Sequence, residues 1–410
     1  MHDREHRYDT AQVEIGRHLV PGKKQPAKFC AHGAPRWVYR VILILALCVL
    51  AVLGWYNREN LTPENALKWL QSNIVGMGNG DGFPKKLSGS SVAPGNFISS
   101  EKNIIFASDT ALMVYNSSGK ELVNIQHSYS SPALCASGAY MMLYNLKGKN
   151  CFLKTVAGDS LKFTVKQNII GGAVAANGHS VLLTAADGYC GMLTAYDAEG
   201  KEISYYWFSD YYPTSAAMNP SGTKVAVTGI SAKDGTIVSA VYVIDLTGGK
   251  TVQPVTASTG NFLSSVFWNT DSSVEAVGDT GVFFLNPYSG AKHEYSYSGA
   301  KLTAFCADDG RVAVGLMPYE NSENQKFLVL NSSGEPVLSR QITGKIRSVS
   351  VLGQTAAVLA GGKVTFFSLA AAGDTVNSRN AGNDAYSVAL LDESSAYVLG
   401  ISEVRLVSDK

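Results

Sequence analysis

The chain has 410 residues, of which 46% are apolar and 16% charged, so there is ample material for a large hydrophobic core. A net charge of +1 argues against the basic surface that nucleic-acid binding requires, and we expect no nucleic acid partner. The 40 glycines, 20 tyrosines and 15 phenylalanines are typical of a protein with many strands and tight turns.

The N-terminal segment, residues 1–36, is basic and contains few apolar residues. Residues 1–40 hold eight Lys and Arg against four Asp and Glu, a local charge of +4 in a nearly neutral chain. A segment of this composition buries too little apolar surface to fold by itself. We interpret residues 1–36 as a disordered basic tail.

Residues 37–56 have the length and the ends of a transmembrane helix. Every residue from Val41 to Leu53 is apolar, and about twenty helical residues cross the hydrocarbon core of a bilayer. Tryptophan and tyrosine lie at both ends, as in an aromatic belt. Because the preceding residues are basic, the positive-inside rule puts the N-terminus in the cytoplasm and residues 57–410 outside. The sequence predicts a single-pass protein of the cell membrane that contacts the lipid bilayer through residues 37–56.

Two alternatives compete with this interpretation, a cleaved signal peptide and a buried core helix. A signal peptide needs a short basic region and a cleavage site between small residues. Here the preceding region is 40 residues long, and the apolar run leads into Gly54-Trp55-Tyr56-Asn57. The lack of any charge from residue 41 to residue 57 disfavours a core helix of a globular protein.

Residues 57–84 are predicted to form a juxtamembrane helix and a glycine-rich linker. Thr62-Pro63-Glu64 provides an N-cap, a proline at the first helical position and an acid in the first turn. Gly76 ends this helix. The segment from Gly78 to Pro84 lacks the alternating acids of a calcium loop, so we expect a tight turn there.

Beyond Pro84 the sequence shows an internal repeat of short strands. Turn residues follow apolar strands at steps near forty residues, for example at Gly138, Gly178 and Gly222. A second set of Asn/Asp-and-Gly turns separates the outer strands. Four strands in each repeat of this length are typical of a blade of a β-propeller.

The repeats predict an all-β propeller domain over residues 85–410, with eight blades as the preferred count and seven as the alternative. A jelly roll or a pair of sandwiches is disfavoured by the regular step. The last repeat has three strands of its own, and residues 85–92 are predicted to supply the fourth and close the ring. The inner strands are predicted near residues 96–99, 131–136, 171–176, 213–218, 262–267, 301–306, 345–350 and 385–390.

One strand–turn–strand segment, Asn219-Pro220-Ser221-Gly222-Thr223-Lys224-Val225-Ala226-Val227, resembles the repeats of WD40-like and quinoprotein-like propellers. No repeat carries the Gly-His and Trp-Asp pairs of a true WD40 protein. The whole chain resembles a domain-of-unknown-function family of single-pass membrane proteins from Gram-positive bacteria. That resemblance covers roughly residues 40–410 and rests on the apolar segment and on three motifs. The motifs are Ile74-Val75-Gly76-Met77-Gly78 through Gly80-Asp81-Gly82-Phe83-Pro84, Ser108-Asp109-Thr110-Ala111-Leu112 and His127-Ser128-Tyr129-Ser130-Ser131-Pro132.

The sequence carries no recognisable catalytic or cofactor motif. A nucleophile elbow, a phosphate-binding loop, a dinucleotide fingerprint and a HExxH helix are all absent. The six cysteines lack zinc-ligand spacing, and we expect buried free thiols, with one or two disulfides as the alternative. His127, His179 and His293 are interpreted as capping or filling residues. We therefore expect no cofactor, no metal and no enzymatic activity.

A binding surface is the remaining functional hypothesis. In a propeller, the turns from second to third strands and the links between blades emerge on one face. The segments Ile230–Ile237 and Met317–Gln325 are predicted to be long loops on that face. Tyr211, Tyr212 and Tyr319 are the proposed binding residues there, because aromatic side chains on loops add contact area at little entropic cost. The alternative is that residues 205–212 pack between neighbouring blades.

These observations favour an extracytoplasmic, membrane-anchored module that binds an envelope protein, a peptide or a cell-wall polymer. An extracytoplasmic sensor that signals to the basic tail is one alternative. An envelope hydrolase with carboxylates at the mouth of the propeller channel is another, and acids with raised pKa values would favour it.

Overall fold

The computed structural model describes residues 36–56 and 78–409, apart from residues 159, 249–253, 271 and 371–374. The chain divides into two compact units between Tyr56 and Asn57. The predicted basic tail, except for its last residue, and the predicted juxtamembrane helix lie outside the described residues.

The apolar segment of the first unit forms one helix, α1 (Arg36–Tyr56), of 21 residues. Its large apolar side chains between Trp37 and Val49 are exposed, with Trp37 at 65% and Leu43 at 62%. The sequence predicted a membrane crossing at residues 37–56, and the structure supports the helix but not the crossing. Within the described part of the chain, no helix combines the length and the apolar character that spanning a bilayer requires.

The second unit is a β-propeller of eight four-stranded antiparallel sheets, which confirms the preferred blade count. Blades 1 to 4 consist of β2 (Val92–Ser100), β3 (Asn103–Ser108), β4 (Ala111–Tyr115) and β5 (Glu121–Gln126); β6 (Pro132–Ser137), β7 (Tyr140–Asn145), β8 (Asn150–Thr155) and β9 (Leu161–Thr164); β10 (Ile169–Val174), β11 (Ser180–Thr184), β12 (Gly191–Tyr196) and β13 (Glu202–Phe208); and β14 (Tyr212–Met218), β15 (Lys224–Lys233), β16 (Thr236–Asp245) and β17 (Val255–Thr259).

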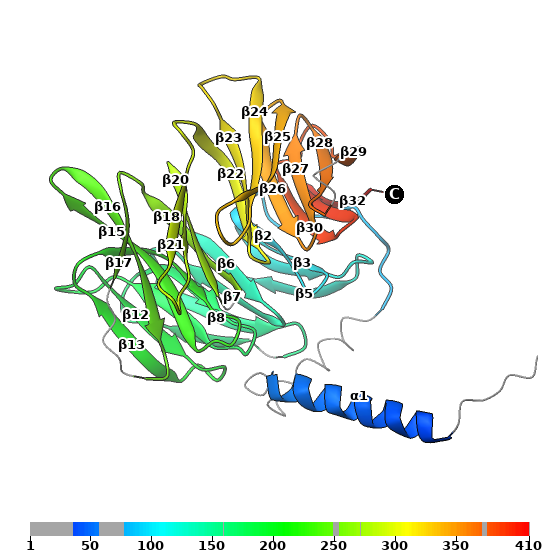
Figure 1. Cartoon of the computed structure of the whole chain (residues 1–410), viewed down its shortest axis with the longest axis horizontal. Helices are drawn as coiled ribbons and strands as arrows, with labels where there is room; N and C mark the ends of the chain where they lie inside the picture. The colour runs from blue at the N-terminus through cyan, green and yellow to red at the C-terminus, as the bar shows by residue number, and fades with distance from the viewer. Residues whose placement is uncertain are drawn as a thin grey trace, which may run out of the picture. The chain divides into compact units, whose positions relative to one another are not determined.

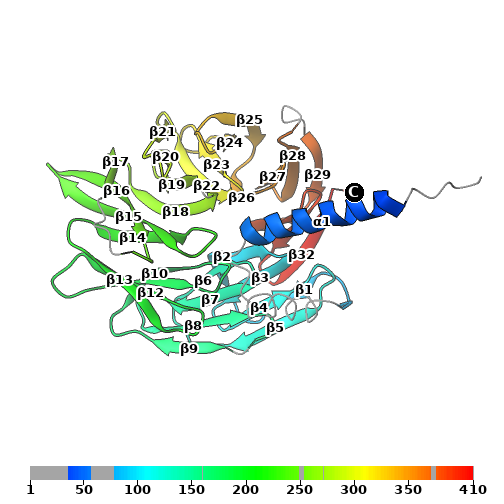
Figure 2. The ribbon, with the colours of Figure 1, turned by 60° about the horizontal axis from the view of Figure 1, so that its bottom comes forward.

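Blades 5 to 8 follow in chain order around the ring (Figures 1 and 2). They consist of β18 (Leu263–Thr270), β19 (Ser273–Gly278), β20 (Gly281–Leu285) and β21 (Lys292–Ser296); β22 (Lys301–Asp308), β23 (Arg311–Met317), β24 (Asn324–Leu330) and β25 (Pro336–Thr343); β26 (Ile346–Leu352), β27 (Thr355–Ala360), β28 (Lys363–Ser368) and β29 (Thr375–Asn380); and β30 (Ser387–Asp392), β31 (Ser395–Leu399) and β32 (Glu403–Ser408), completed by β1 (Lys85–Lys86).

Burial along the strands follows their place in the blade. The first strand of each sheet contacts the first strands of its neighbours and forms the inner ring. Middle strands such as β4, β11 and β20 are buried at every residue, because both of their faces pack against adjacent blades. Outer strands such as β5 and β9 alternate between exposed and covered residues, as half-buried strands do.

The hydrophobic core lies between the blades rather than within them. The described residues form eight buried clusters, and each draws its side chains from two adjacent blades. Polar side chains add links along the inner ring. Asn96 of blade 1 donates to the Pro132 carbonyl at 2.8 Å and accepts from the Leu134 amide at 2.9 Å in blade 2. Each blade is therefore stabilised by contacts with both neighbours.

The ring closes where the N-terminal strand completes the last blade. Lys85 and Lys86 of β1 pair with Val404 and Glu403 of β32, which confirms the predicted closure within residues 85–92. Two tyrosines of blade 8 also reach blade 1. Tyr397 donates to the Lys102 carbonyl at 3.1 Å and Tyr386 to the Val92 carbonyl at 3.3 Å.

The segment predicted as a long loop at residues 230–237 is instead part of a hairpin. β15 and β16 stay paired as far as Lys233 and Thr236, so only two residues form the turn. These are Asp234 and Gly235, both with positive φ, as the tight two-residue hairpin turn requires. The other predicted loop is confirmed, because residues 318–323 separate β23 from β24.

The glycine-rich segment that precedes β1 docks on the turn between β4 and β5. The Gly82 amide donates to the Ser118 carbonyl at 3.0 Å, and the Gly80 amide donates to the Ser118 hydroxyl at 2.9 Å. The backbones approach so closely that a methyl group on Gly119 would collide with the Gly82 carbonyl. Close backbone contact thus requires glycine at positions 80 and 119, next to the closing strand.

We predict that Gly119→Ala destabilises the propeller more than Gly290→Ala. Both glycines have positive φ in a turn between third and fourth strands, but the space around Gly290 is open. We expect about 1 kcal/mol for the left-handed backbone at either position. At Gly119 we expect a further 1–3 kcal/mol, approximately, for overpacking. Urea unfolding measures both, and equal losses would contradict the docking of the glycine-rich segment.

Candidate binding surface

The antiparallel order of the strands sorts the connections onto two faces of the propeller. The links between blades and the turns from second to third strands emerge together, and we call this end the link face. The turns from first to second and from third to fourth strands emerge at the opposite end, the hairpin face.

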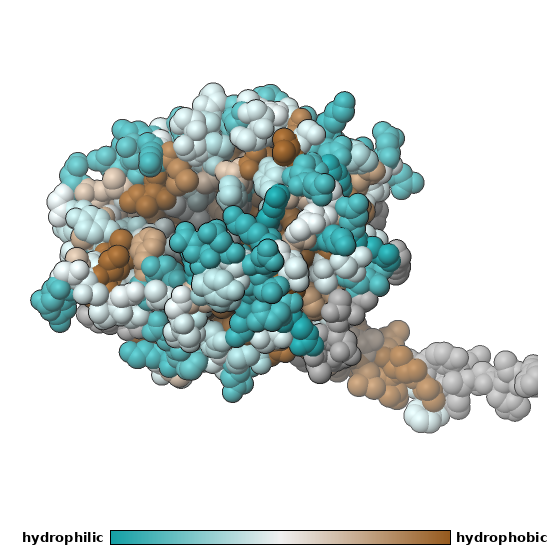
Figure 3. All heavy atoms as spheres, turned by 90° about the horizontal axis from the view of Figure 1, so that it is seen from above, coloured by the Kyte–Doolittle hydropathy of each residue, from teal (hydrophilic) through white to brown (hydrophobic). Residues whose placement is uncertain are grey.

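Exposed large apolar side chains are concentrated at the link face. Among the described residues, five lie in or beside its connections and are 45–70% exposed: Tyr189, Tyr212, Ile237, Tyr319 and Ile401. On the hairpin face, the described residue of this kind is Tyr288, and the Lys224 ammonium lies 4.6 Å from its ring centroid. Figure 3 shows one side of the surface as mostly pale and teal, with separate brown patches of hydrophobic residues. The link face is therefore the candidate binding surface.

The three tyrosines proposed from the sequence fall into different environments. Tyr211 is half-buried and packs edge-on against Tyr242, with ring centroids 6.1 Å apart, in the core between blades 3 and 4. Tyr212 is 62% exposed at the start of β14, and Tyr319 is 70% exposed in the turn between β23 and β24. Blade 5 lies between these two tyrosines in chain order around the ring. Tyr211 is thus a packing residue by position, and the binding role of the other two stays a prediction.

An exposed aromatic group lies at the outer edge of blade 3, within residues 205–212 that the sequence analysis treated only as possible packing residues. Ile203, Tyr205 and Trp207 of β13 are 40%, 59% and 40% exposed. The Trp207 ring lies 4.9 Å from that of Tyr189, in the turn before β12. The sequence signal for this stripe was the alternation of Ile203, Tyr205 and Trp207 with Tyr206 and Phe208 along the strand. It was missed because aromatic residues occupy both faces of the strand.

A groove of about 510 Å³ lies between blades 1 and 2. His127, Tyr129, Cys151, Phe152 and Phe163 are among its lining residues. The His127 Nδ1 accepts from the Tyr129 amide at 3.2 Å, and burial lowers the pKa of His127. Burial also raises the pKa of the Cys151 thiol to about 12, so the thiolate form of a nucleophile is disfavoured. The groove offers shape and aromatic surface rather than an activated nucleophile.

The other cysteines and possible metal ligands were also located. Cys48, Cys135, Cys151, Cys190 and Cys306 are free thiols, as expected, but of these only Cys151 is buried; Cys48 is exposed and the other three are partly exposed. Within the described ranges, no group of three or more His, Cys, Asp or Glu side chains is arranged to hold a metal ion.

Among the described residues, Asp308 is an acid with the raised pKa that the hydrolase alternative requires. Burial raises the pKa of Asp308, at the end of inner strand β22, and the neighbouring charge of Asp309 adds to the effect. The two carboxyl groups are adjacent in sequence, and Asp309 pairs with Arg311 at 3.2 Å. At this end of β22 the described residues therefore provide one acid with a raised pKa beside a carboxylate that is already ion-paired, not two carboxylates facing each other across a substrate position.

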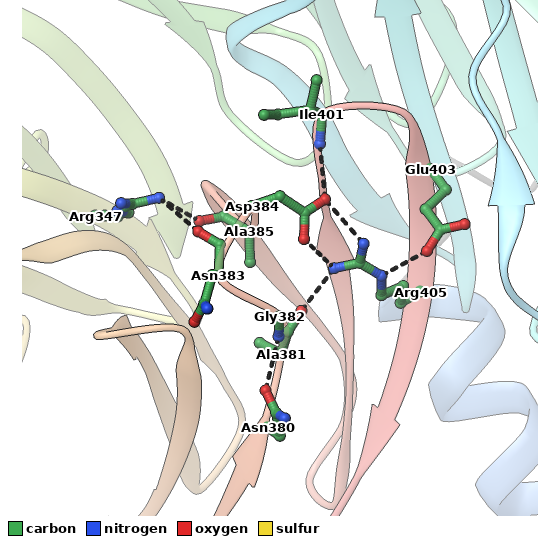
Figure 4. Close-up of polar contacts among 10 residues, drawn as sticks. All are labelled: Arg347, Asn380, Ala381, Gly382, Asn383, Asp384, Ala385, Ile401, Glu403 and Arg405. Atoms are coloured by element: carbon green, nitrogen blue, oxygen red, sulfur yellow. Dashed lines mark hydrogen bonds and ion pairs between the residues drawn. The ribbon is translucent and has the colours of Figure 1, made fainter.

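An ionic network fixes the link into blade 8 (Figure 4). The Arg405 guanidinium on β32 donates to both carboxylate oxygens of Asp384, at 2.7 and 2.8 Å, and to Glu403 at 2.7 Å. Asp384 also accepts from the Ile401 amide at 3.2 Å. Because Ile401 is one of the exposed apolar residues of the link face, this network holds part of the candidate surface in place.

The same network makes a testable contribution to acid stability. The hydrogen bonds from Arg405 lower the pKa of Asp384 below its ordinary value. A depressed folded-state pKa stabilises the protein above the unfolded pKa, near 3.9 for aspartate, and this stabilisation disappears as the pH falls through the folded value. We predict that Asp384→Asn lowers the free energy of unfolding at pH 7, and that the difference from the wild type shrinks below about pH 4.

Asp309→Asn is the matched control for this experiment. Its ion pair with Arg311 has a carboxylate that is 60% exposed, and exposed pairs contribute little. Chemical unfolding at pH 7 and pH 3 measures both variants. A constant difference between Asp384→Asn and the wild type across this range would contradict the proposed role of the Asp384 carboxylate.

Solved structures of low sequence identity share the propeller fold. The C-terminal WD40 domain of Sif2 is 12% identical with a TM-score of 0.54, and the match covers 80% of this chain and 98% of that one. A eukaryotic initiation factor is 11% identical with a TM-score of 0.52, covering 81% and 87%. AztD from Citrobacter koseri is 10% identical with a TM-score of 0.50, covering 70% and 86%. At these identities the likeness establishes the fold alone.

A comparison with functionally described proteins gives no match. A family match does cover most of the propeller. It extends over residues 85–403, from the closing strand β1 to the start of the strand β32 with which it pairs. With this match and the eight-bladed fold, the chain belongs to the Family of unknown function (DUF5711).

Proposed function

We propose that this protein is a binding module of the cell envelope, with its propeller outside the cytoplasm and helix α1 as its membrane anchor. Its partner is an envelope protein, a peptide or a cell-wall polymer that docks on the link face. The observation that carries the proposal is the collection of exposed aromatic and aliphatic side chains on that face.

Two features support recognition rather than chance exposure. Large aromatic side chains at protein surfaces are enriched where partners bind, because each buries much area at the loss of few rotatable bonds. Tyr212 and Tyr319 extend from short connections that are held by strands at both ends, so little ordering is needed on binding. In contrast, burial favours the neutral forms of the groove's His127 and Cys151.

The membrane anchor is supported by the composition of α1. Its residues from Val41 to Tyr56 carry no charge, and tryptophan and tyrosine lie at both ends. Exposed apolar side chains such as Leu43 and Leu47 gain free energy when a bilayer covers them.

We predict that the double variant Leu43→Arg/Leu47→Arg moves the protein from the membrane pellet to the soluble fraction. Each arginine in a membrane-embedded helix costs roughly 3 kcal/mol, so the pair costs about 6 kcal/mol. Carbonate extraction of cell membranes followed by blotting measures the distribution. Recovery of the wild-type protein in the soluble fraction would overturn the anchor.

We further predict that Tyr212→Ser/Tyr319→Ser removes specific crosslinks that the full chain forms in its own membrane. Loss of the two exposed tyrosines is expected to weaken binding about 100-fold, at 1–2 kcal/mol for each tyrosine. In-cell crosslinking with mass spectrometry, or with analysis of attached polymer, is the measurement.

Tyr288→Ser on the hairpin face is the matched control, since Tyr288 is 61% exposed and belongs to the same kind of side chain. It should leave the crosslinks unchanged. Equal crosslinking by all three proteins would rule out the link face as the binding surface.

A further inference from the structure

We propose that β13, the outer strand of blade 3, accepts an extended basic peptide segment as a fifth strand of its sheet. This inference rests on the proposed binding function and names a partner chemistry for it. The position of β13 at the rim, outside β12, is seen in both Figure 1 and Figure 2. In the part of the chain that the structure describes, the sheet order β10-β11-β12-β13 leaves the outer edge of β13 without a paired strand.

The side chains of β13 distinguish it from the other outer strands. Ile203, Tyr205 and Trp207 alternate along the strand and are 40–59% exposed, so they form one apolar stripe. Of the described side chains on the other outer strands, Val337 on β25 is the large apolar one that is comparably exposed. The stripe gives an added strand a row of contacts on one face of the sheet.

The edge of β13 also lacks the usual protection against strand pairing. Exposed edge strands are commonly kept short or interrupted by proline, lysine or arginine. β9 has four residues and contains Lys162, and β25 contains Pro336 and Arg340. β13 has seven residues, Glu202 to Phe208, with no proline and no basic residue. Its backbone groups are therefore available to an incoming strand.

The opposite face of β13 holds the strand rigid. Phe208 is fully buried and packs edge-on against Tyr242 of blade 4, with ring centroids 5.1 Å apart. Tyr206 lies 5.0 Å from Phe208 and 6.0 Å from Tyr242. Because the strand is already held in place, little conformational entropy is lost when a partner strand pairs with it.

The charges around the stripe select a basic partner. Between residues 187 and 210 the chain contains five acids and one lysine, against a net charge of +1 for the whole protein. Asp197, Glu199 and Asp210 lie in the connections at either end of β13, and Glu202 is its first residue. Asp187 lies in the turn between β11 and β12. Lysine or arginine side chains of an added strand would meet these carboxylates and the aromatic faces of Tyr189, Tyr205 and Trp207.

The test uses the detergent-solubilised full chain and a synthetic octapeptide of alternating lysine and valine, titrated by calorimetry. We expect saturable binding, weakened about tenfold or more by Tyr205→Lys and by Trp207→Lys, because each loses an aromatic contact and adds a like charge to the peptide. Tyr288→Lys, on the hairpin face, should bind as the wild type does. Thermal unfolding of each variant verifies that the propeller is intact.

Two altered peptides test the strand-pairing and charge arguments separately. N-methylation of alternate backbone amides removes hydrogen-bond donors and should weaken binding about tenfold or more. Glutamate in place of lysine should abolish it. Equal binding of the methylated peptide, or of the wild type and Tyr205→Lys, would overturn the proposal. So would binding of a neutral oligosaccharide at the stripe in place of the peptide.

The outcome of this experiment can be distinguished from a failure of the proposed function. If the octapeptide does not bind but the Tyr212→Ser/Tyr319→Ser variant still loses its crosslinks, the protein is a binding module and β13 is not its peptide site. If the crosslinks are unaffected and the octapeptide binds as expected, the recognition surface is β13 rather than the tyrosines of the link face.

Discussion

The structure depends on a shared core, because no blade of this propeller buries its apolar surface by itself. Each of the eight buried clusters takes side chains from two adjacent blades, so every blade needs both neighbours. A linear array would expose one face at each end. Pairing of β1 with β32 prevents this, and Tyr386 and Tyr397 reinforce the closure through hydrogen bonds to blade 1.

Closure also decides which residues are available for recognition. Middle strands such as β4 and β11 have neighbours on both faces and are buried at every residue, whereas connections, outer strands and some inner-strand residues such as Phe305 present side chains to solvent. The links and second-to-third turns share one face, which brings together exposed apolar residues that are far apart in sequence. The Arg405–Asp384 network shows how such a connection is held, since it ties the link before β30 to the turn that carries Ile401.

Blade 3 illustrates how one strand serves stability and recognition at once. On one face of β13, Tyr206 and Phe208 join the core shared with blade 4. On the other face, Tyr205 and Trp207 remain exposed because neighbouring blades diverge toward the rim. Substitutions on the two faces should therefore have different consequences, one for folding and the other for binding.

The sequence alone predicted the all-β class, eight repeats in preference to seven and the closing segment, because turn residues and strand-length apolar runs are local signals that repeat. Only the tertiary structure decided that Tyr211 is a packing residue while Tyr212 beside it is exposed, since this depends on the position of Tyr242 in the next blade. The structure also shows that residues 230–237, predicted as a loop, form the paired ends of a hairpin and its turn. The candidate surface and the groove required the arrangement of the blades, because burial and proximity are set by contacts between distant segments.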